Sequence, residues 1–272
     1  MLARARRRDR DRALDLCRRH PTYPTQIAAW IHEGGLEGQK TAGILFIDTS
    51  GGLAFVSELG VVMPYLDEEA SIEALARWLG PLGARVVVGP RRPAEILWRH
   101  LEASGIRTRI SRDQVSYAVT RAGFRAPRSH RLNLRAARAE DLEPLLAASA
   151  AMAIEESRDD PASRAPELFR RRIERRVAEG RDFVLFENGQ LVFKANVAAS
   201  SPHGGHIEGV YTAPHARGRG LGTAGTAWVT RWILERAPAA TLLVNADNAA
   251  ARRIYERIGY VQQYDSRTFL AA

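Results

Sequence analysis

A glycine-rich turn between an expected strand and an expected helix limits the possible folds of this chain more than any other feature. The stretch runs from Gly209 to Thr223, with glycines at positions 218, 220 and 222. Glycine lets backbone N–H groups approach an anion closely, and a helix N-terminus favours negative charge. Arg217 and Arg219 add cationic donors to the same turn. The pattern therefore predicts a cradle for a pyrophosphate group.

Three nucleotide-binding motifs can be compared with this turn. A P-loop ends in Gly-Lys-Ser/Thr, and the turn contains no lysine. A Rossmann turn needs Gly or Ala where Thr223 stands, and an acidic residue after the next strand, for which Asp247 is a weak candidate. The third motif, R/Q-x-x-G-x-G/A, agrees with residues 217–222 at every fixed position. An ordinary tight turn is the structural alternative.

A second pattern lies downstream, from Leu242 to Tyr260. It consists of a strand followed by N-x-x-A-x-x-L/I-Y-x-x-x-G-F/Y, beginning at Asn248 and ending at Gly259-Tyr260. Asn248 is a good helix N-cap and Gly259 a good residue to end that helix. With both motifs in this order and spacing, residues 131–272 resemble a GNAT (GCN5-related) N-acetyltransferase domain of the FR47-like branch. The tight match is confined to residues 206–260.

The resemblance implies acetyl-CoA as co-substrate and no metal. In GNAT domains the strand before the turn pairs its free backbone groups with the pantetheine arm, in the manner of an added strand. Asn248 matches a family position that contacts pantetheine. The residues implied to bind the cofactor are Val210, Tyr211, Thr212, Arg217, Gly218, Arg219, Gly220, Leu221, Gly222, Thr223 and Asn248.

The resemblance also implies two catalytic residues. Tyr255 matches the family tyrosine near the CoA sulfur, where it would act as general acid, and a packed core tyrosine is the alternative. Glu208, in the strand before Gly209, matches the carboxylate that many GNAT enzymes use as base, and a solvated strand residue is the alternative. His206 is a second candidate for the base.

Three further residues are expected to bind the acceptor. Asn245 ends a strand, where sheets of this kind open toward a ligand. Glu155 and Glu156, with Asp159 and Asp160 beyond them, form an acidic cluster at the end of a helix. Such a cluster would suit an amine or basic acceptor, and a solvated charged loop is the equally weighted alternative.

The chain divides into two halves at the aperiodic segment 121–130, which gives expected domains at residues 1–125 and 131–272. The N-terminal half repeats the element order of the second half but has no glycine-rich phosphate loop. It resembles the degenerate N-terminal domains of actinobacterial tandem GNAT proteins. The expected fold class is α/β (α+β), with two tandem GNAT-like domains, each a mixed, mostly antiparallel sheet flanked by helices. Each half is expected to close with a strand pair, at 106–120 and at 260–270.

Charge and composition leave a few alternatives open. The net charge is +9, supplied almost entirely by arginine, since Lys40 and Lys194 are the only lysines. The arginines are scattered along the chain, so a nucleic-acid partner is not favoured. With one cysteine and no long apolar stretch, we expect a cytoplasmic protein with no membrane partner. The expected partner is an amine-bearing small molecule or protein, and a homodimer is left open. The alternative function is a non-catalytic acyl-CoA-binding regulatory module.

Overall fold

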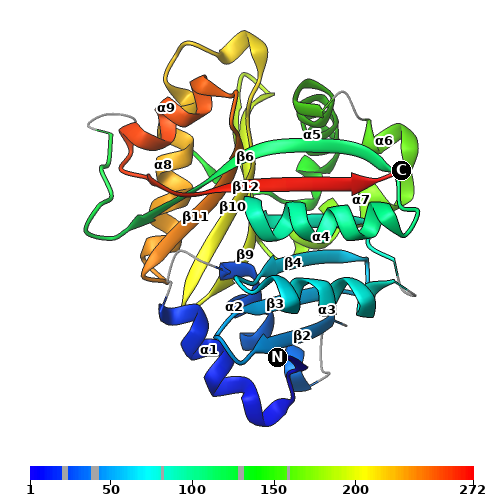
Figure 1. The fold of residues 1–272 in the computed structure, drawn as a ribbon. Helices are drawn as coiled ribbons and strands as arrows, with labels where there is room; N and C mark the ends of the chain where they lie inside the picture. The colour runs from blue at the N-terminus through cyan, green and yellow to red at the C-terminus, as the bar shows by residue number, and fades with distance from the viewer. Residues whose placement is uncertain (20–23, 38–42, 81–82, 128–131, 158–159) are drawn as a thin grey trace.

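The computed structural model describes residues 1–19, 24–37, 43–80, 83–127, 132–157 and 160–272. Within these ranges, twelve strands form one continuous sheet (Figure 1). Their order across the sheet is β1-β2-β3-β4-β5-β12-β6-β11-β10-β9-β8-β7. The strands are β1 (Leu2–Arg4), β2 (Gly43–Asp48), β3 (Leu53–Ser57), β4 (Val61–Tyr65), β5 (Val86–Pro90), β6 (Thr108–Thr120), β7 (Arg135–Ala136), β8 (Asp182–Glu187), β9 (Gln190–Ser201), β10 (Gly204–Thr212), β11 (Ala239–Asn245) and β12 (Val261–Ala271).

The expected mixed, mostly antiparallel architecture is confirmed. Among the strand pairs described, β4 with β5 and β10 with β11 are parallel. These two pairs stand at equivalent places in the two halves. The repeat of element order that the sequence suggested is therefore also a repeat of sheet topology.

The expectation that each half closes with its own strand pair is wrong. After its last helix, each half contributes one long strand, β6 or β12, and these two strands pair with each other in the middle of the sheet. β6 also pairs with β11 of the second half, and β12 with β5 of the first. The two halves thus exchange strands, and a single sheet runs across the expected boundary.

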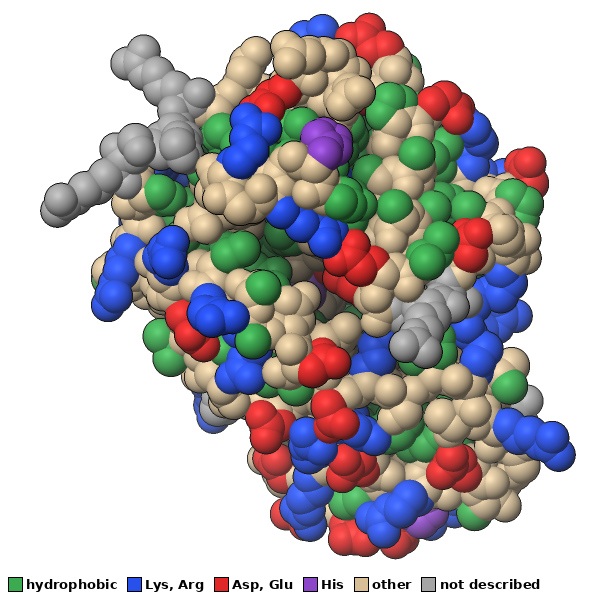
Figure 2. All heavy atoms as spheres, turned by 90° about the horizontal axis from the view of Figure 1, so that it is seen from above, with side chains coloured by type: hydrophobic (Ala, Val, Ile, Leu, Met, Phe, Trp, Pro, Cys, Tyr) green, Lys and Arg blue, Asp and Glu red, His purple; other side chains and the backbone are tan. Residues whose placement is uncertain are grey.

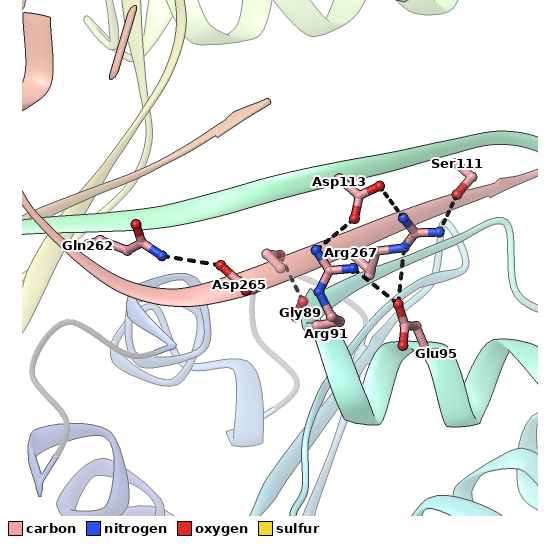
Figure 3. A network of polar contacts seen from close by, with 9 residues as sticks. Gly89, Arg91, Glu95, Ser111, Asp113, Gln262, Asp265 and Arg267 are labelled. Atoms are coloured by element: carbon pink, nitrogen blue, oxygen red, sulfur yellow. Dashed lines mark hydrogen bonds and ion pairs between the residues drawn. The ribbon is translucent and has the colours of Figure 1, made fainter. Parts of the chain in front are cut away.

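Residues 111–113, within the strand pair expected at 106–120, instead continue β6 without a break, and charged side chains pair there across β6 and β12 (Figure 3). Asp113 on β6 accepts from Arg267 of β12 at 2.5 Å and from Arg91 at 2.7 Å. Arg267 also donates to Ser111 at 2.8 Å. The bond from Arg267 is the main cause that lowers the pKa of Asp113. The network therefore links side chains of the two exchanged strands.

Helices cover both faces of the sheet. On the second half, α8 (Leu221–Leu234) and α9 (Ala249–Arg257) pack on one face over a core that includes Phe193, Ile207 and Tyr255. The opposite face carries α5 (Leu142–Ser157), α7 (Pro166–Ala178) and, from the first half, α2 (Thr25–His32). The remaining helices are α1 (Arg10–Arg19), α3 (Glu69–Leu79), α4 (Arg91–Ala103) and α6 (Pro161–Arg164).

Helix α2 ties the first half to the face of β9 and β10. Thr25 at its start is buried, and its hydroxyl lies 2.9 Å from that of Thr241 on β11. Glu33, just after α2, accepts from Arg181 at 3.0 Å. Across the part of the chain that the structure describes, no helix is long and apolar enough to cross a membrane.

Candidate functional site

The parallel strands β10 and β11 separate partway along their length. They pair at three positions, from Gly205 with Ala240 to Ile207 with Leu242. Beyond these positions β10 continues to Thr212 and β11 to Asn245 without further pairing to each other. The residues Val210, Tyr211 and Thr212, expected to contact pantetheine, therefore lie on the separated part of β10. Backbone groups on such an edge are free to pair with an extended ligand.

A β-bulge marks the point where the strands part. Glu208 pairs with Asn196 and Tyr211 with Lys194, so the register between β10 and β9 shifts at Gly209 and Val210. Gly209 has a φ of +61°, and a Cβ at this position would collide with the side-chain oxygen of Asn196. Only glycine fits this backbone without strain.

The glycine-rich turn leads directly into α8. Gly218 and Gly220 have φ values of +77° and +79°, and Gly220 is the N-cap of the helix. A Cβ on Gly222 would lie 3.2 Å from the Thr212 hydroxyl and 3.3 Å from Ile254 Cδ1. The N–H groups of the first helical turn, Leu221 to Thr223, have no intrahelical acceptor. The turn therefore has the shape and the free donors that a pyrophosphate group requires.

Both arginines of the turn form ion pairs with carboxylates. Arg217 donates to Glu155 at 2.7 Å and to the carbonyl oxygen of Thr212 at 3.0 Å. Arg219 forms an ion pair with Glu187 at 2.8 Å. Glu155, expected at the acceptor site, thus contacts the glycine-rich turn. Glu187 is the last residue of β8, just before the Asn188-Gly189 turn, and no sequence motif linked it to the glycine-rich turn.

Tyr255 lies on α9 with its side chain 6% exposed. Its ring lies between those of Tyr117 and Tyr260, with centroid distances of 6.2 and 6.0 Å. Burial raises the pKa of Tyr255, and the charge of Glu156 raises it further. The hydroxyl therefore stays protonated at neutral pH, as a proton donor must.

Glu208 and His206 lie on the face of β10 opposite the α8 core. The Glu208 carboxylate is partly exposed and 3.9 Å from His206 Nε2. His206 is buried, its Nδ1 lies 2.8 Å from the Thr241 hydroxyl, and burial lowers its pKa. The exposed Glu208 is thus the better placed of the two to meet an incoming amine.

The remaining expected residues lie around the same opening. Asn245 accepts from Gln114 of β6 at 3.3 Å, so a residue of the first half contacts it. Asn248 caps α9 by accepting from Ala251 N–H at 3.0 Å, which confirms its structural role. Glu156 is solvent-accessible, yet partial removal from water raises its pKa. Asp159 lies outside the described residues, and Asp160 caps α6.

A buried lysine that the sequence analysis missed completes the site. Lys194 on β9 is 1% exposed and projects on the same face as Asn196. Its amine lies 3.2 Å from where a Cβ on Gly209 would be. An isolated lysine in a strand has no motif, so only the fold could show that it reaches the bulge. Seen from the end of the sheet where β10 and β11 part, the surface is hollowed near its centre (Figure 2).

The separated parallel strands, the bulge and the glycine-rich turn before α8 form the arrangement that the resemblance to GNAT domains implied. Residues 193–270 match the family described as FR47-like protein, so this part of the chain is similar to that family. The chain spans the whole length of a GNAT-family acetyltransferase from Colwellia psychrerythraea and is covered in full, with 12% identity and a TM-score of 0.55.

Two other solved structures share the fold over the length of both halves. A Drosophila structural-genomics protein has 14% identity and a TM-score of 0.70, covering 99% of this chain and 98% of its own. A GCN5-related N-acetyltransferase from Sphaerobacter thermophilus has 18% identity and a TM-score of 0.55, covering 99% and 94%. No curated protein matches the sequence. At these identities, the structural matches show the fold.

Proposed function

We propose that this protein transfers an acetyl group from acetyl-CoA to an amine acceptor, either a small molecule or a protein. The observation that carries the proposal is the separation of β10 from β11 at the Gly209 bulge. The N-terminus of α8, whose free N–H groups could bind a pyrophosphate, follows shortly after it in the chain. The residues fit this co-substrate because the free donors of the turn and the free edge of β10 follow one another along the chain. Pyrophosphate would bind at residues 217–223 and pantetheine along residues 210–212.

The side chains around the bulge suit aminolysis of a thioester. Glu208 would take the proton that the acceptor amine must lose. Tyr255, kept protonated by burial, would supply a proton to the departing thiolate. The amine attacks the carbonyl carbon, and the tetrahedral oxyanion needs a donor in a site shielded from water.

An acceptor screen tests the proposal. Purified full-length protein is incubated with acetyl-CoA and panels of polyamines, amino acids and peptides, and products are read by mass spectrometry together with thiol release. We expect at least one amine to gain an acetyl group in a reaction that Glu208→Gln slows. Tight acetyl-CoA binding with no acceptor acetylated would instead favour the non-catalytic acyl-CoA-binding module.

A further inference from the structure

Lys194 is a buried amine at the centre of the site. Its β9 neighbours Phe193 and Ala195 face the α8 core, whereas Lys194 and Asn196 point to the opposite face. No hydrogen bond or close ion pair links the Lys194 amine to the residues that the structure describes. A buried ionisable group without a close partner is costly, so the position of Lys194 calls for an explanation.

Other polar groups near the bulge also lack partners. Within the described residues, Asn196 Nδ2 and Asp182 Oδ1 are buried without a hydrogen bond. The second oxygen of Asp182 accepts from Arg176 at 2.8 Å. Because Arg176 already balances the charge of Asp182, this aspartate does not fully neutralise Lys194. Asn196 Nδ2 and the Lys194 amine are donors, whereas Asp182 Oδ1 is an acceptor. The two donors near the bulge could both serve a ligand oxygen.

The position of a thioester follows from the order of elements, and it rests on the proposed function. With pyrophosphate at the turn and pantetheine along Val210 to Thr212, the thiol end of the arm reaches Gly209 and Glu208. The amine of Lys194 reaches the same bulge from the neighbouring strand. Lys194 and the thioester carbonyl would therefore meet at Gly209.

We propose that the Lys194 ammonium stabilises the oxyanion that forms when the acceptor amine attacks the thioester. In that step a C–N bond forms at the carbonyl carbon, and the C=O electron pair moves onto the oxygen beside Lys194. The amine proton passes to Glu208. When the intermediate collapses, the electron pair returns, the C–S bond breaks, and the thiolate leaves with a proton from Tyr255.

The surroundings of Lys194 set its charge state. Burial lowers the pKa of Lys194 to about 8, opposed by Asp182 on β8 and by Glu156 and Glu208, while Arg176 on α7 lowers it further. The third helix on this face, α2, carries His32 as its titratable side chain. At neutral pH the amine is mostly protonated. Its charge is lost as the pH rises through about 8, so oxyanion stabilisation should fade on the alkaline side.

The test compares Lys194→Met, which keeps the length of the side chain, with Lys194→Arg, which keeps a charge that does not titrate. The carbonyl resonance of acetyl-CoA carrying ¹³C at C1 of the acetyl group is followed by NMR on the bound complex across pH 6.5–9.5, a range of about 1.5 units to either side of the Lys194 pKa. In the wild type this resonance should titrate near the pKa of Lys194. In Lys194→Met the titration of this resonance should vanish. The affinity for acetyl-CoA should stay within about threefold of wild type, because the contacts that bind the co-substrate in its ground state are unchanged.

Turnover supplies the second readout. With an acceptor found in the screen, Lys194→Met should lose about 10²-fold in kcat, the usual effect of removing one oxyanion donor. Lys194→Arg should retain more activity than Lys194→Met, and its kcat should not fall as the pH rises through about 8. Thermal melts check that both variants are folded, and Lys194→Gln replaces Lys194→Met if the latter is not.

The outcomes separate the two proposals. A carbonyl resonance that titrates identically in wild type and Lys194→Met overturns the role of Lys194 while leaving the transferase intact. Stable acetylation of Lys194 itself, seen by intact mass and located against Lys40, would make it a nucleophile and also overturn the role. Absence of acetyl-CoA binding by the wild type removes the proposed function, and this inference with it.

Discussion

Replacing Gly222 by aspartate should weaken CoA binding without lowering the stability of the fold. Gly222 is the second residue of α8 and does not need a positive φ, unlike Gly218 and Gly220. A Cβ there meets Thr212 and Ile254 at 3.2 and 3.3 Å, so those neighbours must yield by only a few tenths of an ångström. Gly222→Asn makes the same contacts and serves as the matched control. The two variants then differ by one negative charge.

The magnitude follows from that charge. Two unit charges about 4 Å apart interact by about 4 kcal/mol at an effective dielectric constant near 20. Solvent access and salt reduce this to about 2 kcal/mol, so Gly222→Asp should bind CoA about 30-fold more weakly than Gly222→Asn. The same carboxylate at a helix N-terminus should stabilise the fold by about 0.3–1 kcal/mol.

Titration calorimetry with CoA and thermal melts measure the two effects on the same samples. The difference in affinity should shrink at high salt, because the two charges are partly exposed. Equal CoA affinity in folded Gly222→Asp and Gly222→Asn would refute the assignment of the turn as the pyrophosphate site.

Three further changes test the remaining assignments. Tyr255→Phe should lower kcat by about 10–100-fold at neutral pH and leave the Kd for acetyl-CoA nearly unchanged; a parallel loss of binding and rate would show a packing role instead. Glu155→Gln removes the carboxylate that competes for Arg217, so calorimetry should show CoA binding tightened by up to about fivefold, the worth of an exposed ion pair; weaker binding would mean that Glu155 positions the arginine. Fragments 1–125 and 131–272 should each fail to give a cooperative melt alone and should recover one when co-expressed, because β6 and β12 lie in each other's half of the sheet; a cooperative melt of either fragment alone would contradict this.

Local motifs allowed much of the second half to be predicted from the sequence. The dipeptide Asn188-Gly189 is typical of a two-residue hairpin turn, and in the turn between β8 and β9 Asn188 has the positive φ of +49° that such a turn needs. Asn248 and Gly259 set the ends of α9 as expected. These signals work because capping and turn formation depend on neighbours in the chain.

The features that the sequence did not reveal depend on contacts between distant segments. The Asp113–Arg267 pair joins residues of the two halves, so neither residue signals the strand exchange by itself. The pairing of Glu155 with Arg217 is equally distant in the chain. Lys194 became a candidate only when the bulge at Gly209 placed it beside the opening.

The strand exchange has a consequence for how the chain folds during synthesis. β5 (Val86–Pro90) is synthesised long before its neighbour β12 (Val261–Ala271). Until then one edge of the first half stays unpaired, and an unpaired edge is prone to aggregation. Pairings between such remote segments also slow folding. The nascent first half must therefore wait for the rest of the chain, a period during which chaperone protection would matter most.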